Sequence, residues 1–242
     1  MARFIDFSNL QWEAPSTGVE RAVLADREHA GSQEMLAELI RLAGGGSIEL
    51  GVPGGSDRYL FTLAGECQLS GTDVSQAFGP RAFAVLRQGE RYSLRGVGAE
   101  TSLVVSVVAP PPGVSRDTPG LSGRTLIARV AELPVVEEQE SGKRRIYLVT
   151  ETNTGSRRAH GMIVAYRGDT VTPLHHHPDA ESLFVFLAGR GLVLIDRREV
   201  AVGPGHAVFF ARGDRHMLRG VDHEGMEFLE FHIPGAYKVV PA

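Results

Sequence analysis

The residues with the clearest chemical potential lie in TPLHHHPDAESLFVFLAGRG, Thr172–Gly191. Three consecutive histidines are followed by Pro178-Asp179 and, two residues later, by Glu181. On an extended strand His175 and His177 project from the same face about 6–7 Å apart. That is close enough to share one ion at metal–nitrogen distances of about 2.1 Å. A turn at the proline would bring Glu181 back as an oxygen ligand, so the segment predicts part of a metal site. The alternative is an exposed histidine run.

A fourth candidate ligand lies far along the chain. The segment GHAVFFARGDRH delivers His216 directly after a Gly-Asp turn. With His175, His177 and Glu181 it would supply three neutral imidazoles and one carboxylate to one divalent metal ion. Two positions of an octahedral ion would stay open, as in a relative of the two-histidine, one-carboxylate sites used for iron oxygen chemistry. Manganese or iron suits this donor set best, and nickel, cobalt and zinc are alternatives.

The elements that must position these residues belong to a repeat. FGPRAFAVLRQGERYSLRGV (78–97) and VGPGHAVFFARGDRHMLRGV (202–221) align without a gap at an offset of 124 residues (203 − 79). The same offset aligns STGVERAVL (16–24) with ESGKRRIYL (140–148). A register held this far along the chain indicates two domains of one fold.

The repeat sets the domain limits that we expect. An N-terminal domain covers 1–108, a linker rich in proline and glycine covers 109–133, and a C-terminal domain covers 134–242. Within each copy, short apolar runs between Gly, Pro and Asp turns predict an all-β sandwich or barrel. The segment SQEMLAELIRLA (32–43) resembles a helix on its own, but its repeat partner GSRRAHGMIVAYR has a strand pattern. We therefore predict a strand in both copies.

The N-terminal copy is an internal control for the metal site. At the same offset the four candidate ligands face Gly51, Pro53, Asp57 and Tyr92. All three histidines are therefore missing together from this copy, although its turns are kept. A packing role would leave their joint absence unexplained, so the comparison favours a metal site confined to the C-terminal domain.

The two histidine segments resemble the signature motifs of the cupin superfamily, HxH-x(3,4)-E-x6-G and G-x5-P-x-G-x2-H. His175, His177 and Glu181 fall on the ligand positions of the first motif, and His216 falls on that of the second. Two positions depart from the pattern: seven residues rather than six separate Glu181 from Gly189, and an alanine stands where proline is usual. The resemblance implies a bicupin, two tandem jelly-roll (double-stranded β-helix) barrels. Its N-terminal barrel would be degenerate and its C-terminal barrel would bind metal.

Polar side chains gather on two strand faces that are more apolar in the N-terminal copy. By the period-2 parity of strands, His160 and Tyr166 share one face, and Glu230 and His232 share another. Burying unpaired polar groups costs about 1–3 kcal/mol each, so a cavity that holds water or substrate is an economical explanation. These four residues are our candidate acid/base groups. The alternative is an edge strand or a dimer face.

Composition limits the classes of partner. The chain of 242 residues is 43% hydrophobic and 22% charged, with a formal net charge of −4 and no basic block. We therefore expect no nucleic-acid partner and no membrane contact. The N-terminal residues lack a signal-peptide pattern, so we expect a cytoplasmic protein. The single cysteine excludes an intrachain disulfide and a thiolate metal cluster. A homodimer is what the family resemblance implies.

These inferences converge on a metal-dependent enzyme acting on a small anionic or chelating organic molecule bound at the open positions of the ion. Bicupins of this kind include dioxygenases, decarboxylases and an aminohydrolase. We rank dioxygenase-like chemistry first and a hydrolase or isomerase second. The (S)-ureidoglycine aminohydrolase type is similar, but it uses a Glu-x-His-xxx-His order whose last position is Ser182 here. A non-catalytic binding or sensing module is the other class. It is favoured if the four polar residues point away from the metal.

Overall fold

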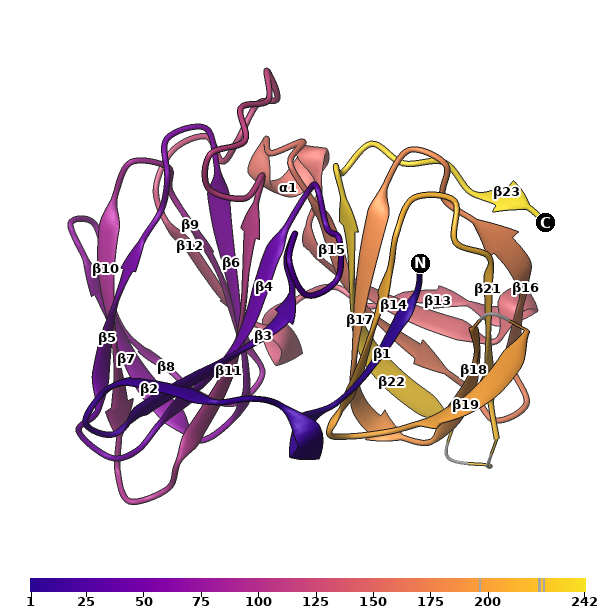
Figure 1. Ribbon diagram of the computed structural model, residues 1–242, viewed down its shortest axis with the longest axis horizontal. Coiled ribbons are helices and arrows are strands. Elements are labelled where there is room, and N and C mark those ends of the chain that lie inside the picture. The colour runs from indigo at the N-terminus through magenta and orange to yellow at the C-terminus, as the bar shows by residue number, and fades with distance from the viewer. Residues whose placement is uncertain (196, 222, 224) are drawn as a thin grey trace. The chain divides into compact units, whose positions relative to one another are not determined.

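The protein divides into two compact units, each built from antiparallel strands (Figure 1). The N-terminal unit comprises Gln11–Glu132 and Glu151–Arg158, and the C-terminal unit comprises Met1–Leu10, Leu133–Thr150 and Ala159–Ala242. The computed structural model describes residues 1–195, 197–221, 223 and 225–242. The all-β prediction is confirmed, and no described helix is long and apolar enough to cross a bilayer.

The N-terminal unit contains two sheets. Its seven-stranded sheet has the order β12 (Leu126–Arg129), β9 (Ala82–Leu86), β6 (Asp57–Ala64), β11 (Ser102–Ala109), β4 (Leu36–Leu42), β3 (Val19–Ala25) and β2 (Glu13–Ser16). Its four-stranded sheet has the order β5 (Ser47–Gly51), β10 (Arg91–Val97), β7 (Glu66–Gly71) and β8 (Ser75–Phe78). The short helices of this unit are η2 (Val130–Glu132) and α1 (Glu151–Thr154).

The C-terminal unit has the same two-sheet plan. Its seven-stranded sheet has the order β1 (Arg3–Asp6), β20 (His206–Phe210), β17 (Glu181–Gly189), β22 (Met226–Ile233), β15 (His160–Tyr166), β14 (Lys143–Val149) and β13 (Val136–Glu138). Its five-stranded sheet has the order β19 (Arg198–Val202), β18 (Gly191–Ile195), β21 (His216–Gly220), β16 (Val171–His176) and β23 (Val240–Pro241). The 3-10 helices are η1 (Phe7–Asn9) and η3 (Gln139–Ser141).

The sequence repeat is visible in the strand bounds. The pairs β3 and β14, β4 and β15, β9 and β20, and β11 and β22 each begin and end 124 residues apart (160 − 36 for β4 and β15). The segment with a helical pattern in the N-terminal copy is the strand β4, as its partner predicted. Pairing with β3 and β11 on both sides overrides the local helix propensity of its Leu, Ala and Glu residues.

Two edge strands do not pair where the expected domain limits place them. β1 precedes the N-terminal copy, yet it pairs with β20 of the C-terminal unit. β12 lies in the expected linker, yet it pairs with β9 of the N-terminal unit. β9 and β20 are repeat counterparts, and each would otherwise leave a row of unpaired backbone groups at a sheet edge. The strand that precedes each copy covers the edge of the other.

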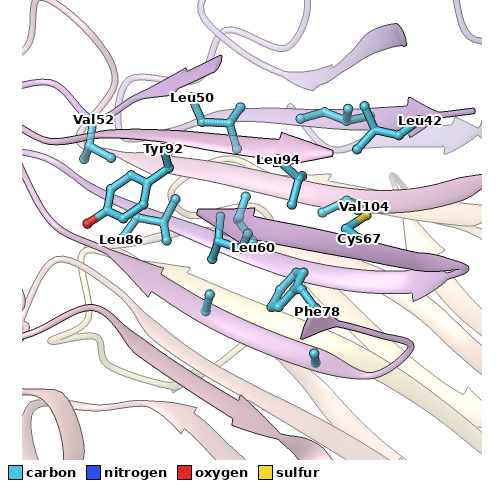
Figure 2. Packing of buried hydrophobic residues seen from close by; sticks show 14 of the residues in the cluster. Leu42, Leu50, Val52, Leu60, Cys67, Phe78, Leu86, Tyr92, Leu94 and Val104 are labelled. Carbon is cyan, nitrogen blue, oxygen red and sulfur yellow. The ribbon is translucent and has the colours of Figure 1, made fainter. Parts of the chain in front are cut away.

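Apolar side chains from both sheets fill the interior of the N-terminal unit (Figure 2). Leu60 of β6 and Val104 of β11 pack in one cluster with Leu94 of β10 and Cys67 of β7. Tyr92, the repeat counterpart of His216, is 1% exposed within this cluster. Burial of this kind stabilises by roughly 1.5–3 kcal/mol per large side chain. The C-terminal unit has a similar apolar cluster, but one part of its interior is lined with polar groups.

Candidate metal centre

Three histidines converge at one point of the C-terminal unit. His175 lies near the end of β16, His177 follows that strand, and His216 begins β21. β16 and β21 are paired, and His175 stands directly opposite His216 in the register. One potential ligand atom from each of the three side chains lies within 4.8 Å of the other two. Strand parity predicted that His175 and His177 lie together, and the second motif added His216. The structure brings all three into one cluster.

Hydrogen bonds orient all three rings in the same sense. Each Nδ1 lies within hydrogen-bond distance of a backbone carbonyl, and because a carbonyl only accepts, each Nδ1 carries the proton. The acceptors for His175, His177 and His216 are the carbonyls of Pro173 at 2.8 Å, Lys238 at 2.8 Å and Asp214 at 3.0 Å. Each Nε2 therefore keeps its lone pair. Nε2 of His177 and Nε2 of His216 are buried and have no hydrogen-bond partner within the part of the chain described. Such a set fits a divalent cation.

The electrostatic environment keeps these ligands neutral. Burial lowers the pKa of His177 to about 4, with a further lowering by the charge of His232. Burial lowers the pKa of His216 to about 3, and the neighbouring His175 contributes in the same direction. A metal ligand must be the neutral imidazole. The site therefore holds its donor atoms in the binding form well below neutral pH.

Glu181 is not brought to the histidines. It is 3% exposed, and the described group of mutually close ligand atoms does not include it. Successive residues of β17 point to opposite faces, and the cavity face is taken by Ser182, which contacts His232, and by Phe184. Glu181 therefore points to the opposite face of the sheet. Six residues separate Ser182 from Gly189, the spacing of the cupin motif, so spacing was the signal that could have identified Ser182 at this position.

A cavity of about 130 Å³ adjoins the histidines. Three of the four predicted acid/base residues line it, namely Tyr166, Glu230 and His232. The cavity also receives side chains that the sequence reasoning missed. These are Lys143 and Arg145 of β14, Thr172 of β16, and Tyr237 and Val239 of the C-terminal segment.

His160 is the one predicted polar residue outside the cavity lining. Its ring packs edge-on against Tyr147 and Tyr237, with centroids 5.7 and 5.4 Å apart. Burial lowers the pKa of His160 to about 4, and the charge of His232 adds to that shift. The structure thus places this imidazole between two aromatic rings.

Glu230 and His232 form a hydrogen-bonded pair on the cavity face of β22. Oε1 of Glu230 lies 2.6 Å from Nε2 of His232, and Oγ of Ser182 lies 2.8 Å from Nδ1 of the same ring. The ring of Tyr237 stacks on His232 with centroids 3.8 Å apart. Burial by itself raises the pKa of Glu230, but the charge and hydrogen bond of His232, together with the charges of His177 and Arg145, outweigh it and leave that pKa lowered. The pair can therefore hold a proton next to His177, whose ring centroid is 4.5 Å from that of His232.

The equivalent place in the N-terminal unit carries a guanidinium. Arg58 stands at the repeat position of Ser182 and is 8% exposed. It donates to Oγ of Ser106 at 2.7 Å and to the carbonyl of Gly51 at 3.2 Å, and it lies 3.7 Å from Glu38. Ser106 is the repeat counterpart of Glu230, and Gly51 is that of His175. A fixed positive charge thus occupies the region where the other copy has its histidines.

Comparison with known proteins finds a family match within the C-terminal unit. Residues 162–232 match the cupin domain family. The matched segment contains the three histidines, Ser182 and the Glu230–His232 pair. No curated protein sequence gives a significant match to the chain.

The cupin match agrees with the likeness to solved structures. Protein Ylba from E. coli, of the family DUF861, is 14% identical with a TM-score of 0.80, covering 96% of this chain and 90% of that one. Oxalate decarboxylase from Lactobacillus farciminis, in a formate complex, is 13% identical with a TM-score of 0.75, covering 98% and 88%. Bacillus subtilis oxalate decarboxylase, in a structure used to assign its Mn(II) centres, is 14% identical with a TM-score of 0.73, covering 98% of this chain and 78% of that one. At this identity the likeness shows the fold, and together the findings support the cupin superfamily.

Proposed function

We propose that this protein is a metal-dependent cupin enzyme. It binds one divalent ion through His175, His177 and His216 and acts on a small anionic or chelating organic molecule in the adjoining cavity. The observation that carries the proposal is the pair of buried Nε2 atoms without a partner, on rings whose Nδ1 atoms are fixed by backbone carbonyls. An unsatisfied buried polar atom costs about 1–3 kcal/mol, and a cation between the rings removes that cost.

Manganese or iron is the metal that we favour. Three imidazole donors leave the remaining octahedral positions free for ligand or water, and nickel, cobalt and zinc also accept such donors. The likeness to a decarboxylase with Mn(II) centres supports manganese. A bound ion of this kind supplies Lewis acidity and open coordination positions for substrate oxygens.

The protein's own contribution to the chemistry is proton handling by Glu230 and His232. Glu230 is held as the carboxylate by its neighbour, and its Oε1 shares a proton with Nε2 of His232 at 2.6 Å. Ser182 and the stacked Tyr237 keep the imidazole in place. A positioned acid/base group contributes about 10²–10⁴ in rate. Tyr166 lines the cavity beside this pair, and its hydroxyl hydrogen-bonds to Thr172.

Dioxygenase-like chemistry is the first candidate because the ion has several open positions. A hydrolase or isomerase, as in ureidoglycine aminohydrolase-like bicupins, is the second, and the Glu230–His232 pair favours it because proton transfer needs such a group. A non-catalytic binding module is disfavoured by the same pair, since both residues line the cavity. The whole chain would then be two tandem jelly-roll cupin domains, with Arg58 and Tyr92 in place of a second ion in the N-terminal domain.

The test is elemental analysis of protein purified without a histidine tag, followed by a substrate screen with and without oxygen. We expect about one equivalent of manganese or iron per chain. Turnover that needs oxygen would support the first candidate, and anaerobic turnover would support the second. Protein that takes up no divalent ion after dialysis against manganese or iron would refute the proposal.

A further inference from the structure

Lys143 begins β14 and contributes its side chain to the lining of the metal-site cavity. It is one of two lysines in the chain. Lys143 and Arg145 share one strand face, since they are two residues apart, and both reach the cavity that His175 and His177 also line. The same small cavity therefore contains an ammonium group and two histidines of the candidate metal site.

The other charges in the cavity already have partners. Arg145 is ion-paired with Glu138, and Glu230 is paired with His232. The ammonium of Lys143 forms no ion pair with any carboxylate that the structure describes, and its Nζ lies over the ring of Tyr166 at 5.3 Å from the centroid. Burial lowers the pKa of Lys143, with Glu230 partly opposing the effect. The environment thus penalises this charge, and Glu230, which is paired with His232, offsets the penalty only in part.

We propose that Lys143 binds a carboxylate of the ligand whose other end occupies the metal, so that the natural ligand is a short-chain dicarboxylate. The inference rests on the proposed function, because the second anchor is the ion at the three histidines. An ion with neutral ligands and a separate ammonium are two positive centres, and a ligand with one anionic group at each end satisfies both. A partly buried cation gains most from a carboxylate in a charge-assisted hydrogen bond.

The size of the cavity limits the chain length of that ligand. Its volume of about 130 Å³ equals the share of roughly four water molecules at about 30 Å³ each. That space suits a short acid better than an aromatic or sugar-sized substrate. Chain length is therefore a property to vary in the experiment, with two-, three- and four-carbon diacids as the probes.

The first arm of the test uses the two lysines themselves. Manganese-loaded protein is treated with an amine-acetylating reagent in the presence of oxalate, malonate or succinate, or of the corresponding monoamides. Acetylation of each lysine is then read by mass spectrometry. We expect at least one diacid to protect Lys143 and its monoamide to protect it far less. Lys238 is exposed and serves as the internal control, with unchanged labelling throughout. Failure of all three diacids to protect Lys143, or equal protection by the monoamides, would overturn the inference.

The second arm measures diacid affinity by calorimetry in variants with equal metal content. Lys143→Met is expected to weaken the best diacid at least about tenfold, equivalent to about 1.4 kcal/mol, while Lys143→Arg retains most of the affinity. Arg144→Met is the matched control, because the alternation of β14 turns Arg144 to the other face, where it pairs with Glu227. Diacid affinity within about twofold of wild type in Lys143→Met would refute the inference. A wild type that holds no ion would refute the proposed function as well, and metal analysis separates the two failures.

Discussion

The hydroxyl oxygen of Ser182 lies 2.8 Å from Nδ1 of His232. With that nitrogen engaged, the opposite nitrogen of the ring faces Oε1 of Glu230 at 2.6 Å. A residue on β17 thus sets the orientation of the histidine on β22 and, through it, the hydrogen-bond partner of the cavity glutamate. The hydrogen-bonded series from Ser182 to Glu230 runs along the side of the cavity next to His177.

Replacing His177 by Ala is expected to remove most of the bound metal, measured as the ion-to-protein ratio by elemental analysis. The reason is that the ion would lose one of three nitrogen donors. Tyr92→Ala is the matched control in the N-terminal unit. It should leave the metal ratio intact and lower the free energy of unfolding by about 3–5 kcal/mol, the usual cost of emptying a buried aromatic site. An unchanged ratio in His177→Ala, or metal loss in Tyr92→Ala, would contradict the site assignment.

Glu181→Gln is expected to keep the wild-type metal ratio, because the carboxylate lies outside the histidine group. Ser182→Ala should also keep the ion, but it releases Nδ1 of His232. We therefore expect it to lower turnover while leaving folding intact, as judged by circular dichroism. A large loss of metal in Glu181→Gln would show that the acid is a ligand after all, as the motif resemblance suggested.

Glu230→Gln is expected to reduce the turnover number by about 10²–10⁴, the range for removing a general acid or base. Its metal content should be unchanged, because Glu230 pairs with His232 rather than with the three histidines. The measurement is kcat for the substrate found in the screen, together with the metal ratio. Wild-type turnover in this variant would remove Glu230 from the proposed mechanism.

His160 predicts a specific loss of stability in acid. Its pKa is lowered to about 4 in the folded protein, whereas an unfolded chain protonates histidine near 6.5. Between these values the unfolded state binds more protons, so stability is full above about pH 6.5 and falls as the pH approaches about 4. Thermal melts across this range should show a shallower decline in His160→Gln than in wild type. Parallel pH profiles would show that His160 is not the source of the effect.

Arg58→Met is expected to destabilise the N-terminal unit by up to about 3–5 kcal/mol, because it leaves a buried carboxylate with a weaker partner. That carboxylate belongs to Glu38, whose second cation, Arg21, lies 3.6 Å away. The double variant Arg58→Met/Glu38→Leu should recover much of the loss. Unfolding by denaturant measures the free energy of unfolding of both variants. An Arg58→Met variant as stable as wild type would exclude a structural role for this guanidinium.

Much of the candidate site could be predicted from the sequence. Strand parity placed His175 and His177 together, and the loss of all three histidines from the N-terminal copy pointed to the other unit for the candidate metal site. The same repeat predicted a strand in the segment 32–43 against its helical pattern, and parity placed Glu230 and His232 on one face. These inferences succeed because the two-residue period of a strand is a local property that the sequence carries directly.

Tertiary structure alone decided what depends on pairing between distant strands. Whether residue 181 or 182 faces the cavity depends on where β17 begins, and a shift of one residue exchanges the two faces of a strand. The domain limits expected from the sequence place β1 in the N-terminal domain and β12 in the linker, but β1 pairs at the sheet edge of the C-terminal unit and β12 at that of the N-terminal unit. The position of Lys143 in the metal-site cavity likewise follows from the packing of β14 beside β15. Spacing along a chain fixes which side chains share a face, and only the register and packing of the sheets fix what that face meets.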